Sequence, residues 1–405
     1  MSRPRTAIVI GGGIAGPVTA IALRKAGIEA TVFEARPPGT QHNGVMLTLA
    51  TNGIDALRAI GAEAAALEIG FATPGITLRT HTGKRLGVTP TGSTRPGSTG
   101  SRTIRRSDLY RAIHAQAADR GITIEGGRRL VAADDGPEGV CAVFDDGSTA
   151  EADILIGADG VHSTVRTLID PGAPRPAYTG LITTGGYAPA TGTATVGGDY
   201  EMIFGKRAFF GYATAPDGEN WWFVNLPHRP EPGRGEVEAV PGAQWRRTFT
   251  QIYRDDAGPA LELISATPDF APMTAIHTVP KLPHWHRGRM IVVGDAAHAP
   301  SPTSGQGASL SIEDAVVLAL SLRDNDSVSA AFAGFESVRR PRVERIIKAA
   351  ARINNSKAPG PAGRFLRDLT LPTILRMTAD SASNRRVFDH QLDWADDHRT
   401  RSGPR

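Results

Sequence analysis

The sequence predicts an α/β protein in which a mostly parallel sheet with helices is joined to an inserted, mostly antiparallel sheet and to C-terminal helices. Three observations carry this prediction. Residues 5–34 read as strand, glycine-rich turn, helix and strand. Residues 175–280 alternate short β-like segments with Gly/Pro turns, and residues 307–354 show long helical patterns. An apolar strand that leads into a helix is typical of parallel sheets, whereas short segments joined by turns are typical of antiparallel ones.

Length and composition exclude several classes of protein. The chain has 405 residues, of which 40% are hydrophobic and 21% charged, enough for two or three domains with substantial cores. The single cysteine, Cys141, excludes a disulfide framework and a Cys-rich metal site. No apolar run reaches the roughly 18 residues of a membrane span, and the N-terminus lacks a signal-peptide pattern. We therefore expect a cytoplasmic protein with no stable membrane anchor, either a monomer or a homodimer.

Charge and acidic turns give no sign of nucleic-acid or metal binding. The net charge is +4, but no basic block with interleaved aromatic residues occurs, so we expect no nucleic-acid partner. The segment Asp145-Asp146-Gly147 lies between two apolar segments, as a hairpin turn does, and we expect no metal there.

The first motif is a dinucleotide-binding signature. The apolar run Thr6–Ile10 is followed by Gly11, Gly13 and Gly16 in the G-x-G-x-x-G frame, then by a helical pattern and a second strand that ends at Glu34. The three glycines suit a tight turn, a close approach to pyrophosphate and close helix packing, and Glu34 suits a ribose hydroxyl. This pattern predicts a Rossmann-like domain, although it does not by itself separate FAD from NAD(P).

The second motif repeats this logic later in the chain. The strand predicted over residues 152–156 leads to Asp159-Gly160 and to a helix start with Ser163. Asp159 can bond ribose or a pyrophosphate-bound water, or orient Arg166. An earlier helix is predicted to begin with Ser107 as its N-cap, which places Arg106 just before the helix, either near a phosphate or ribityl oxygen or in solvent.

The third motif is Gly294-Asp295, which follows the apolar run 290–293. A Pro/Gly loop leads from it to an amphipathic helix predicted over Gly307–Arg323. A helix N-terminus offers free N–H groups and the positive end of a dipole, so this stretch suits an anionic ring system. A further helix is predicted over Ala330–Asn354, interrupted only by Pro341.

Two stretches bear on the substrate. Residues 87–101 are almost entirely Gly, Pro, Ser and Thr, which predicts a mobile loop, either disordered or lid-like. The inserted sheet, with strands predicted at 193–196 and in four other segments, is rich in aromatic residues. Alternation with period two puts Phe209 on one face and Phe210 on the other, so that one face packs and the other lines an apolar pocket. The residues proposed to contact substrate are Met46, Phe204, Phe210, Tyr212 and Trp222.

In this order, the three motifs resemble the landmarks of single-component FAD-dependent monooxygenases of the para-hydroxybenzoate hydroxylase type, over about residues 5–350. The C-terminal part resembles the urate hydroxylase and zeaxanthin epoxidase branch more loosely. Ser304 stands where many members have Gly. The segment 183–186 lacks the Trp-Arg pair of the urate hydroxylases, which argues against a urate-like anion bound in that way.

The resemblance implies a role for individual residues. The N-terminal glycines and Glu34 would hold the ADP half of FAD, Asp295 would contact its ribityl and pyrophosphate region, and Pro302 would lie near the reactive edge of the flavin. Gly307 and Ala308 would present N–H groups to the pyrimidine end of the ring, where reduced flavin is anionic. No catalytic residue is assigned. The other cofactor contacts assigned are Ile14, Ala15, Ala35, Arg36, Val45, Arg106, Val131, Asp159, Gly294 and Gly305.

By the same resemblance, the protein would be an NAD(P)H-consuming monooxygenase with bound FAD. One oxygen of O₂ would pass from a flavin C4a-hydroperoxide to an apolar, aromatic or polyketide-like small molecule, by hydroxylation or epoxidation. The alternatives are a flavin-dependent reductase or dehydrogenase, a flavin halogenase and a non-catalytic ligand binder. The halogenase segment Trp-x-Trp-x-Ile-Pro is only partly present at residues 222–227, where Val224 replaces the second Trp.

The predicted domains alternate along the chain. The FAD-binding domain takes residues 1–70, 102–174 and 281–325, and the β-sheet substrate domain takes 175–280. A hairpin and mobile loop of the substrate lobe occupy 71–101. A helical region at 326–394 and a disordered tail at 395–405 complete the chain.

Overall fold

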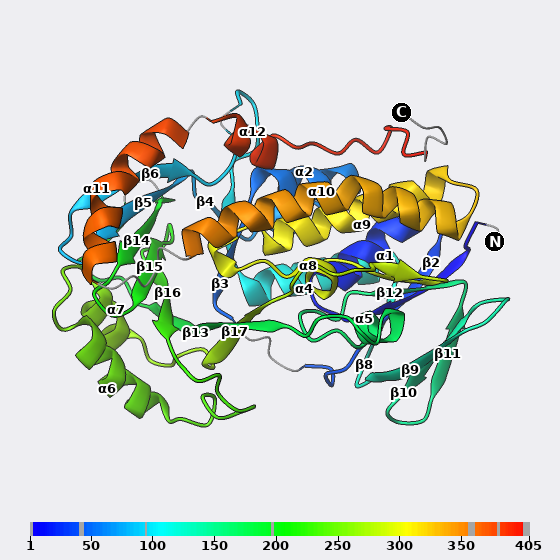
Figure 1. Ribbon diagram of the computed structural model, residues 1–405, viewed down its shortest axis with the longest axis horizontal. Coiled ribbons are helices and arrows are strands. Elements are labelled where there is room, and N and C mark those ends of the chain that lie inside the picture. Colours follow the sequence, from blue (N-terminus) through cyan, green and yellow to red (C-terminus); the bar gives the residue numbers. More distant parts are fainter. Residues whose placement is uncertain are drawn as a thin grey trace.

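The computed structural model describes residues 3–39, 44–93, 95–195, 198–354, 361–378 and 381–399. One six-stranded sheet, in the order β18-β19-β12-β1-β2-β8, carries the N-terminal motif, and all its strands pair in parallel except β18 (Figure 1). The strand predicted at Thr6–Ile10 is confirmed as β1, and its four apolar residues are buried. The other strands are β2 (Glu29–Glu34), β8 (Thr123–Gly126), β12 (Ile154–Gly157), β18 (His286–Arg287) and β19 (Met290–Val292).

Helices pack on this sheet and on one another. The central helix α9 (Gly307–Asp324) contacts α1, α2 and α10 (Figure 1). Every residue of α9 from Ser309 to Leu322 is buried. The prediction of an amphipathic helix is therefore wrong, because packing on several sides leaves α9 no solvent face. The remaining helices of this region are α1 (Ala15–Lys25), α2 (Thr51–Ala59), α3 (Ala64–Leu67), α4 (Arg106–Asp119), α5 (Thr164–Ile169), α8 (Asp295–His298) and the 3₁₀ turn η2 (Pro302–Ser304).

The inserted lobe is built on a seven-stranded sheet in the order β17-β13-β16-β15-β14-β5-β6, antiparallel except where β14 pairs with β5. The expected strand at 193–196 is not formed by Thr193–Thr195, and Val196 lies outside the described residues. Two helices not predicted from the sequence, α6 (Gly242–Tyr253) and α7 (Ala260–Ala266), cover one face. The strands are β5 (Gly75–Thr80), β6 (Arg85–Pro90), β13 (Ala177–Ala188), β14 (Tyr200–Phe204), β15 (Phe209–Thr214), β16 (Asn220–Pro227) and β17 (Thr274–Thr278).

Two three-stranded sheets complete the β-structure. The hairpin turn predicted at Asp145-Asp146-Gly147 is confirmed between β10 and β11, whereas the strand expected over 152–156 is divided, with β11 ending at Ala152 and β12 starting at Ile154. The second small sheet, β3-β7-β4, joins the two lobes. The strands are β9 (Leu130–Asp135), β10 (Val140–Phe144), β11 (Thr149–Ala152), β3 (Met46–Leu49), β7 (Arg102–Arg105) and β4 (Phe71–Ala72).

The segment between β6 and β7, predicted to be mobile, is held by hydrogen bonds. Ser101 Oγ donates to the Thr91 carbonyl (2.6 Å), and both residues are buried. Ser93 Oγ donates to Asp389 of the C-terminal segment (2.5 Å), and Ser93 N donates to Thr51 Oγ1 (3.0 Å). Small hydroxyl side chains here bond locally and across the fold, so composition alone overestimated the freedom of this loop. Residue 94 lies outside the described residues.

The C-terminal part packs on both lobes, since its first long helix contacts α9 and its second contacts β6 of the inserted sheet. Helix α10 (Val328–Asn354) runs through Pro341 without the predicted interruption, and α11 (Pro361–Thr378) and α12 (Ala382–Phe388) follow (Figure 1). The tail expected to be disordered is ordered as far as Arg399: Asn325 Nδ2 donates to the His398 carbonyl (3.1 Å) and His398 N to Asp324 (2.8 Å). Residues 400–405 lie outside the described residues. No helix in the described ranges is long and apolar enough to cross a membrane.

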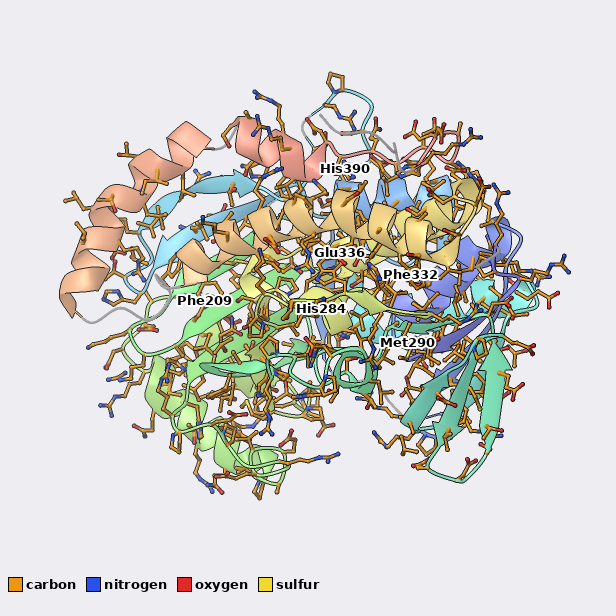
Figure 2. The ribbon with its side chains drawn as sticks, turned by 45° about the vertical axis from the view of Figure 1, so that its right-hand side comes forward. Phe209, His284, Met290, Phe332, Glu336 and His390 are labelled. Carbon is orange, nitrogen blue, oxygen red and sulfur yellow. The ribbon has the colours of Figure 1, made fainter. Side chains whose placement is uncertain are left out.

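We predict that this C-terminal anchoring is acid-sensitive through His390, which lies after α12 (Figure 2). Burial lowers the pKa of His390 from 6.5 to about 4. Below pH 6.5 the His390 imidazole is protonated in the unfolded chain but stays neutral in the folded protein. Folding stability therefore falls as the pH falls from 6.5 towards 4. At pH 5 the loss should be on the order of 1–2 kcal/mol. Urea unfolding at pH 7 and pH 5 should show this loss in the wild type, and a smaller loss in His390→Gln.

Candidate functional site

The turn between β1 and α1 has the close packing that its glycines predict. Gly11 has a φ of 109°, and a Cβ there would lie 2.4 Å from the Ala158 carbonyl oxygen; a Cβ on Gly16 would lie 1.8 Å from the Gly11 oxygen. A Cβ on Gly13 would meet nothing within 4 Å. Two glycines are therefore required by the fold itself, whereas Gly13 faces open space, as expected where a pyrophosphate approaches the backbone.

Glu34 closes this turn from the end of β2. Its Oε2 accepts the Gly12 N–H (2.6 Å) and its Oε1 accepts the Arg36 N–H (3.0 Å). His114 of α4 contacts the Gly12 carbonyl through Nε2 (2.7 Å), and burial lowers the pKa of this imidazole. With the imidazole neutral, Nε2–H donates to the carbonyl. The acid predicted to bind the ribose thus lies at the glycine turn.

The helices α1, α5 and α9 differ at their N-termini. Asp159 accepts hydrogen bonds from Ser163 Oγ (2.5 Å) and from the N–H groups of Thr164 (2.7 Å) and Val165 (3.1 Å), so α5 is capped by its own motif. Helices α1 and α9 have no side-chain cap. Their free N–H groups can bind the anionic parts of a dinucleotide, whereas the contacts of Asp159 are used within the protein.

Asp295 lies at the start of α8, facing the N-terminus of α9. Gly294 before it has a φ of 57°, and a Cβ there would lie 2.6 Å from Ser311 Oγ, so this position requires glycine. Burial raises the pKa of Asp295, and the nearby Arg106 partly opposes that rise. No described residue donates a hydrogen bond to its carboxylate. Asp295 is partly buried, and a carboxylate there without a protein donor fits sugar hydroxyls of a bound cofactor.

Arg106 connects this site to the seam between the lobes. It is the first residue of α4, so Ser107 is not the N-cap as predicted. The Arg106 N–H donates to the Val45 carbonyl (3.0 Å), which also accepts the Tyr187 hydroxyl (2.6 Å) from the inserted sheet. Gly44, with a φ of 106°, lies against the Arg106 side chain. Val45 therefore joins the cofactor side to the sheet lobe.

Beneath the Gly294–Gly307 loop lies a buried charge network that was not predicted from the sequence. Asp314 accepts hydrogen bonds from Gly294 N (2.8 Å), His298 Nε2 (2.5 Å) and Arg339 Nε (2.7 Å). Glu313 pairs with Arg339 (2.5 Å) and Arg342 (2.7 Å). Two features of the sequence could have indicated this network. One is the pair of adjacent acids, Glu313 and Asp314, within an apolar helical segment, and the other is the group of arginines from Arg339 to Arg342. The network holds the loop that carries Asp295.

The inserted sheet has two faces, and the structure assigns each one. Phe210, Tyr212 and Trp222 pack with α6 and α7 in one cluster, on the opposite face of the sheet from Met46, so they are not proposed as substrate contacts. Met46 of β3 packs against the opposite face, here called the inner face, and Phe204 also belongs to it. The large inner-face side chains are Tyr187, Tyr200, Met202, Phe204, Phe209, Trp221 and Phe223.

Three predicted contacts lie at the periphery of these elements. Val131 on β9 is 49% exposed, Pro302 is exposed in η2, and Ala35 is partly buried directly after β2. Their cofactor roles remain predictions.

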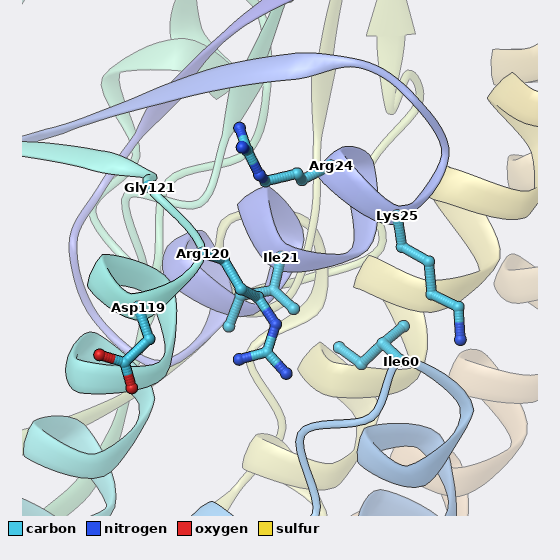
Figure 3. A pocket seen from close by; sticks show the side chains of 7 residues that line it. All are labelled: Ile21, Arg24, Lys25, Ile60, Asp119, Arg120 and Gly121. Atoms are coloured by element: carbon cyan, nitrogen blue, oxygen red, sulfur yellow. The ribbon is translucent and has the colours of Figure 1, made fainter.

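A depression of about 540 Å³ lies apart from this site, where the C-terminal ends of α1 and α4 approach the loop after α2 (Figure 3). Its cations bind the carbonyls there: Lys25 Nζ donates to Ala59 O (2.7 Å) and Arg120 to Gly61 O (2.7 Å). Stabilisation of helix C-termini explains these residues. The lining residues are Ile21, Arg24, Lys25, Ile60, Asp119, Arg120 and Gly121.

The glycine turn gives a direct test of cofactor placement. Gly13→Ala should leave the fold intact, because the added methyl group meets no protein atom, but should weaken FAD binding roughly tenfold by obstructing the phosphate. Fluorescence titration of FAD into the apoprotein measures this. Gly242→Ala in α6, where a Cβ also meets nothing, is the matched control. Equal FAD affinity in all three proteins would contradict the placement.

Comparisons with known proteins agree with this geometry. A family described as FAD binding domain matches residues 5–350. Aurachin C monooxygenase/isomerase of Stigmatella aurantiaca is 31% identical over 357 residues, covering 87% of this chain and 90% of that protein. The 3-amino-4-hydroxybenzoate 2-monooxygenase PtnB3 of Streptomyces platensis is 31% identical over 400 residues, covering 93% and 94%.

The crystal structure of Klebsiella pneumoniae HpxO complexed with FAD and uric acid has the same fold, with a TM-score of 0.81 and 24% identity over 94% of this chain and 97% of that one. The predicted fold class is confirmed. The chain belongs to the FAD-binding family of flavin-dependent monooxygenases, of the para-hydroxybenzoate hydroxylase type, and its cofactor is FAD.

Proposed function

We propose that this monooxygenase takes electrons from NADPH or NADH and inserts one oxygen atom of O₂ into an uncharged aromatic small molecule. The observation that carries the substrate class is the inner face of the inserted sheet, which is aromatic and apolar beside Met46 and Val45. An apolar aromatic surface with few polar groups favours an aromatic ligand.

The charges at the border of the inner face are already compensated. Arg105 lies 4.4 Å from the Tyr187 ring centroid and pairs with Glu219. Arg367 of α11 lies 4.3 Å from the Phe204 ring centroid and pairs with Asp368 (2.7 Å). A substrate carboxylate would therefore have to compete with an existing partner for either arginine. This supports a neutral substrate over a benzoate.

The names of two relatives suggest the kind of ring. One is a probable 2-heptyl-3-hydroxy-4(1H)-quinolone synthase of Rhodococcus erythropolis, 29% identical, and another is the 3-amino-4-hydroxybenzoate 2-monooxygenase of Streptomyces cremeus, 28% identical. The quinolone is neutral and carries an apolar chain, whereas the benzoate is an anion. The inner face supports the first kind of substrate for this chain.

Bound FAD supplies the redox and oxygen chemistry. The N–H groups at the α9 N-terminus would stabilise negative charge on the bound flavin, and Asp295 would hold its ribityl hydroxyls. The aromatic inner face excludes water from the reacting edge. Tyr187 does not serve as a base, because its hydroxyl donates to the Val45 carbonyl and burial raises its pKa to about 12.

The test is oxidation of NADPH and NADH by the FAD-loaded enzyme, followed together with O₂ uptake and product mass. A 2-alkyl-4-quinolone should stimulate both rates and gain one oxygen atom, and 3-amino-4-hydroxybenzoate should do so weakly. Product formation without O₂ would instead indicate a reductase or dehydrogenase, and a halogenated product would indicate a halogenase. Stronger stimulation by the benzoate would overturn the neutral-substrate assignment.

A further inference from the structure

The amide of Gln306 is oriented by a buried carboxylate on the next turns of the same helix. Glu313 is fully buried, and Arg342 donates to both of its oxygens (2.8 and 2.7 Å). Burial alone would raise the pKa of Glu313, but Arg339 and Arg342 hold it well below its ordinary range. The group is therefore an anion, which can only accept hydrogen bonds.

This anion fixes a second amide. Asn52 Nδ2 donates to Glu313 Oε1 (2.7 Å) and also to Gln306 Oε1 (3.0 Å). If the Asn52 amide turned over, its oxygen would face the carboxylate, so only one orientation is allowed. With its oxygen bound to Asn52, Gln306 must direct its Nε2 the other way.

Gln306 occupies the N-cap position of α9, where no side chain caps the helix. The side chain is 3% exposed, yet no hydrogen bond joins its Nε2 to a residue of the described ranges. The next two N–H groups, of Gly307 and Ala308, also have no acceptor within that part of the chain. Three donors thus lie together at one helix end, and one of them is the Nε2 group of a buried residue whose Oε1 alone is bonded.

We propose that Gln306 donates through Nε2 to the flavin ring, and that Glu313 is a positioning residue that sets this donor through Asn52. The proposal rests on the FAD site described above and adds a side-chain donor to the backbone N–H groups of α9. A donor near the pyrimidine end is worth more to the reduced flavin, which is anionic there, than to the oxidised flavin. Gln306 would therefore raise the midpoint potential of the bound cofactor.

The test measures that potential by dye equilibration, without substrate. Gln306→Met removes the donor and keeps the size of the side chain. Relative to oxidised flavin, the affinity for reduced flavin should fall roughly tenfold, which lowers the two-electron potential by about 30 mV. Gln306→Glu should lower the potential further, since it places a carboxylate beside the reduced flavin, which is itself an anion. Both variants should still bind FAD and change its visible absorption spectrum.

The hydrogen-bonded link from Glu313 through Asn52 to Gln306 is tested with Asn52→Leu. This variant, like Gln306→Met, should lower the midpoint potential of the flavin. The double variant should be no lower than Gln306→Met alone, because Asn52 acts only through Gln306. Asn325→Leu removes a buried amide at the other end of α9 and should leave the potential unchanged. An unchanged potential in FAD-loaded Gln306→Met, or additive shifts in the double variant, would overturn the proposal. These midpoint potentials are measured without substrate. A failure of the Gln306 proposal can therefore be distinguished from a failure of the proposed function.

Discussion

Arg339→Met should cost about 3–5 kcal/mol of folding stability at pH 7, because it removes the counter-ion that two buried carboxylates share. Arg339 is completely buried between Glu313 (2.5 Å) and Asp314 (2.7 Å), which are also completely buried. Methionine fills similar space but supplies neither charge nor hydrogen bonds. The measurement is urea unfolding followed by circular dichroism, with FAD removed so that cofactor binding does not add stability.

The pH dependence of this variant identifies the cause. In the wild type, Arg339 and its neighbours hold the pKa values of Glu313 and Asp314 low, so their contribution is present at pH 7 and is lost only as the pH falls below the ordinary pKa values of these acids. Without Arg339, burial should raise both pKa values, and the variant should regain stability as the pH falls and these groups take up protons. The difference from wild type should therefore be smaller at pH 5 than at pH 7.

Arg345→Met is the matched control, since it makes the same change on an exposed position of the same helix. It should change stability by about 0.5 kcal/mol or less. A loss of equal size in Arg339→Met and Arg345→Met would show that the buried charges are not what makes Arg339 important. A loss in Arg339→Met that stays constant between pH 7 and pH 5 would contradict the electrostatic explanation.

The sequence predicted best those features that depend on residues close together in the chain. The unit from Thr6 to Glu34 is confirmed, and within it a Cβ on Gly16 would collide with Gly11 of the same turn, whereas the atom that excludes a Cβ on Gly11 belongs to the distant Ala158. At Gly294 the local factor is the positive φ of 57°, which favours glycine directly before Asp295. Local backbone geometry leaves a readable pattern, so strand, turn and helix could be placed from it.

Features that depend on distant packing could not be predicted. The alternation of side chains along a strand correctly put Phe209 and Phe210 on opposite faces of the inserted sheet. Which of these two faces is covered depends on the packing of α6 and α7, which the sequence did not show. The pattern of α9 did not show that neighbouring helices would bury it on all sides. Asn52, Glu313 and Arg339 come from three helices, and no spacing in the sequence relates them.

Asp295→Asn should weaken FAD binding roughly tenfold to hundredfold, while the apoprotein becomes no less stable. The binding loss follows from replacing a charge-assisted hydrogen bond to the cofactor with a weaker neutral one, a difference of about 1.5–3 kcal/mol. The apoprotein behaves differently, because folding partly buries this carboxylate and raises its pKa. An amide in the same place has a smaller desolvation cost.

The pH dependence of the apoprotein separates these two effects. The raised pKa of Asp295 means that the folded state binds a proton more readily than the unfolded state, so the contribution of this group to stability improves as the pH falls through the raised pKa. The amide introduced by Asp295→Asn cannot titrate, so the stability gain of this variant over wild type should be greatest at neutral pH and vanish in acid. Asp326→Asn, on a fully exposed side chain, should change neither FAD affinity nor this profile. If Asp295→Asn purified with a full complement of FAD and wild-type affinity, Asp295 would not be a cofactor ligand, and the open N-terminus of α9 would have to hold the flavin without it.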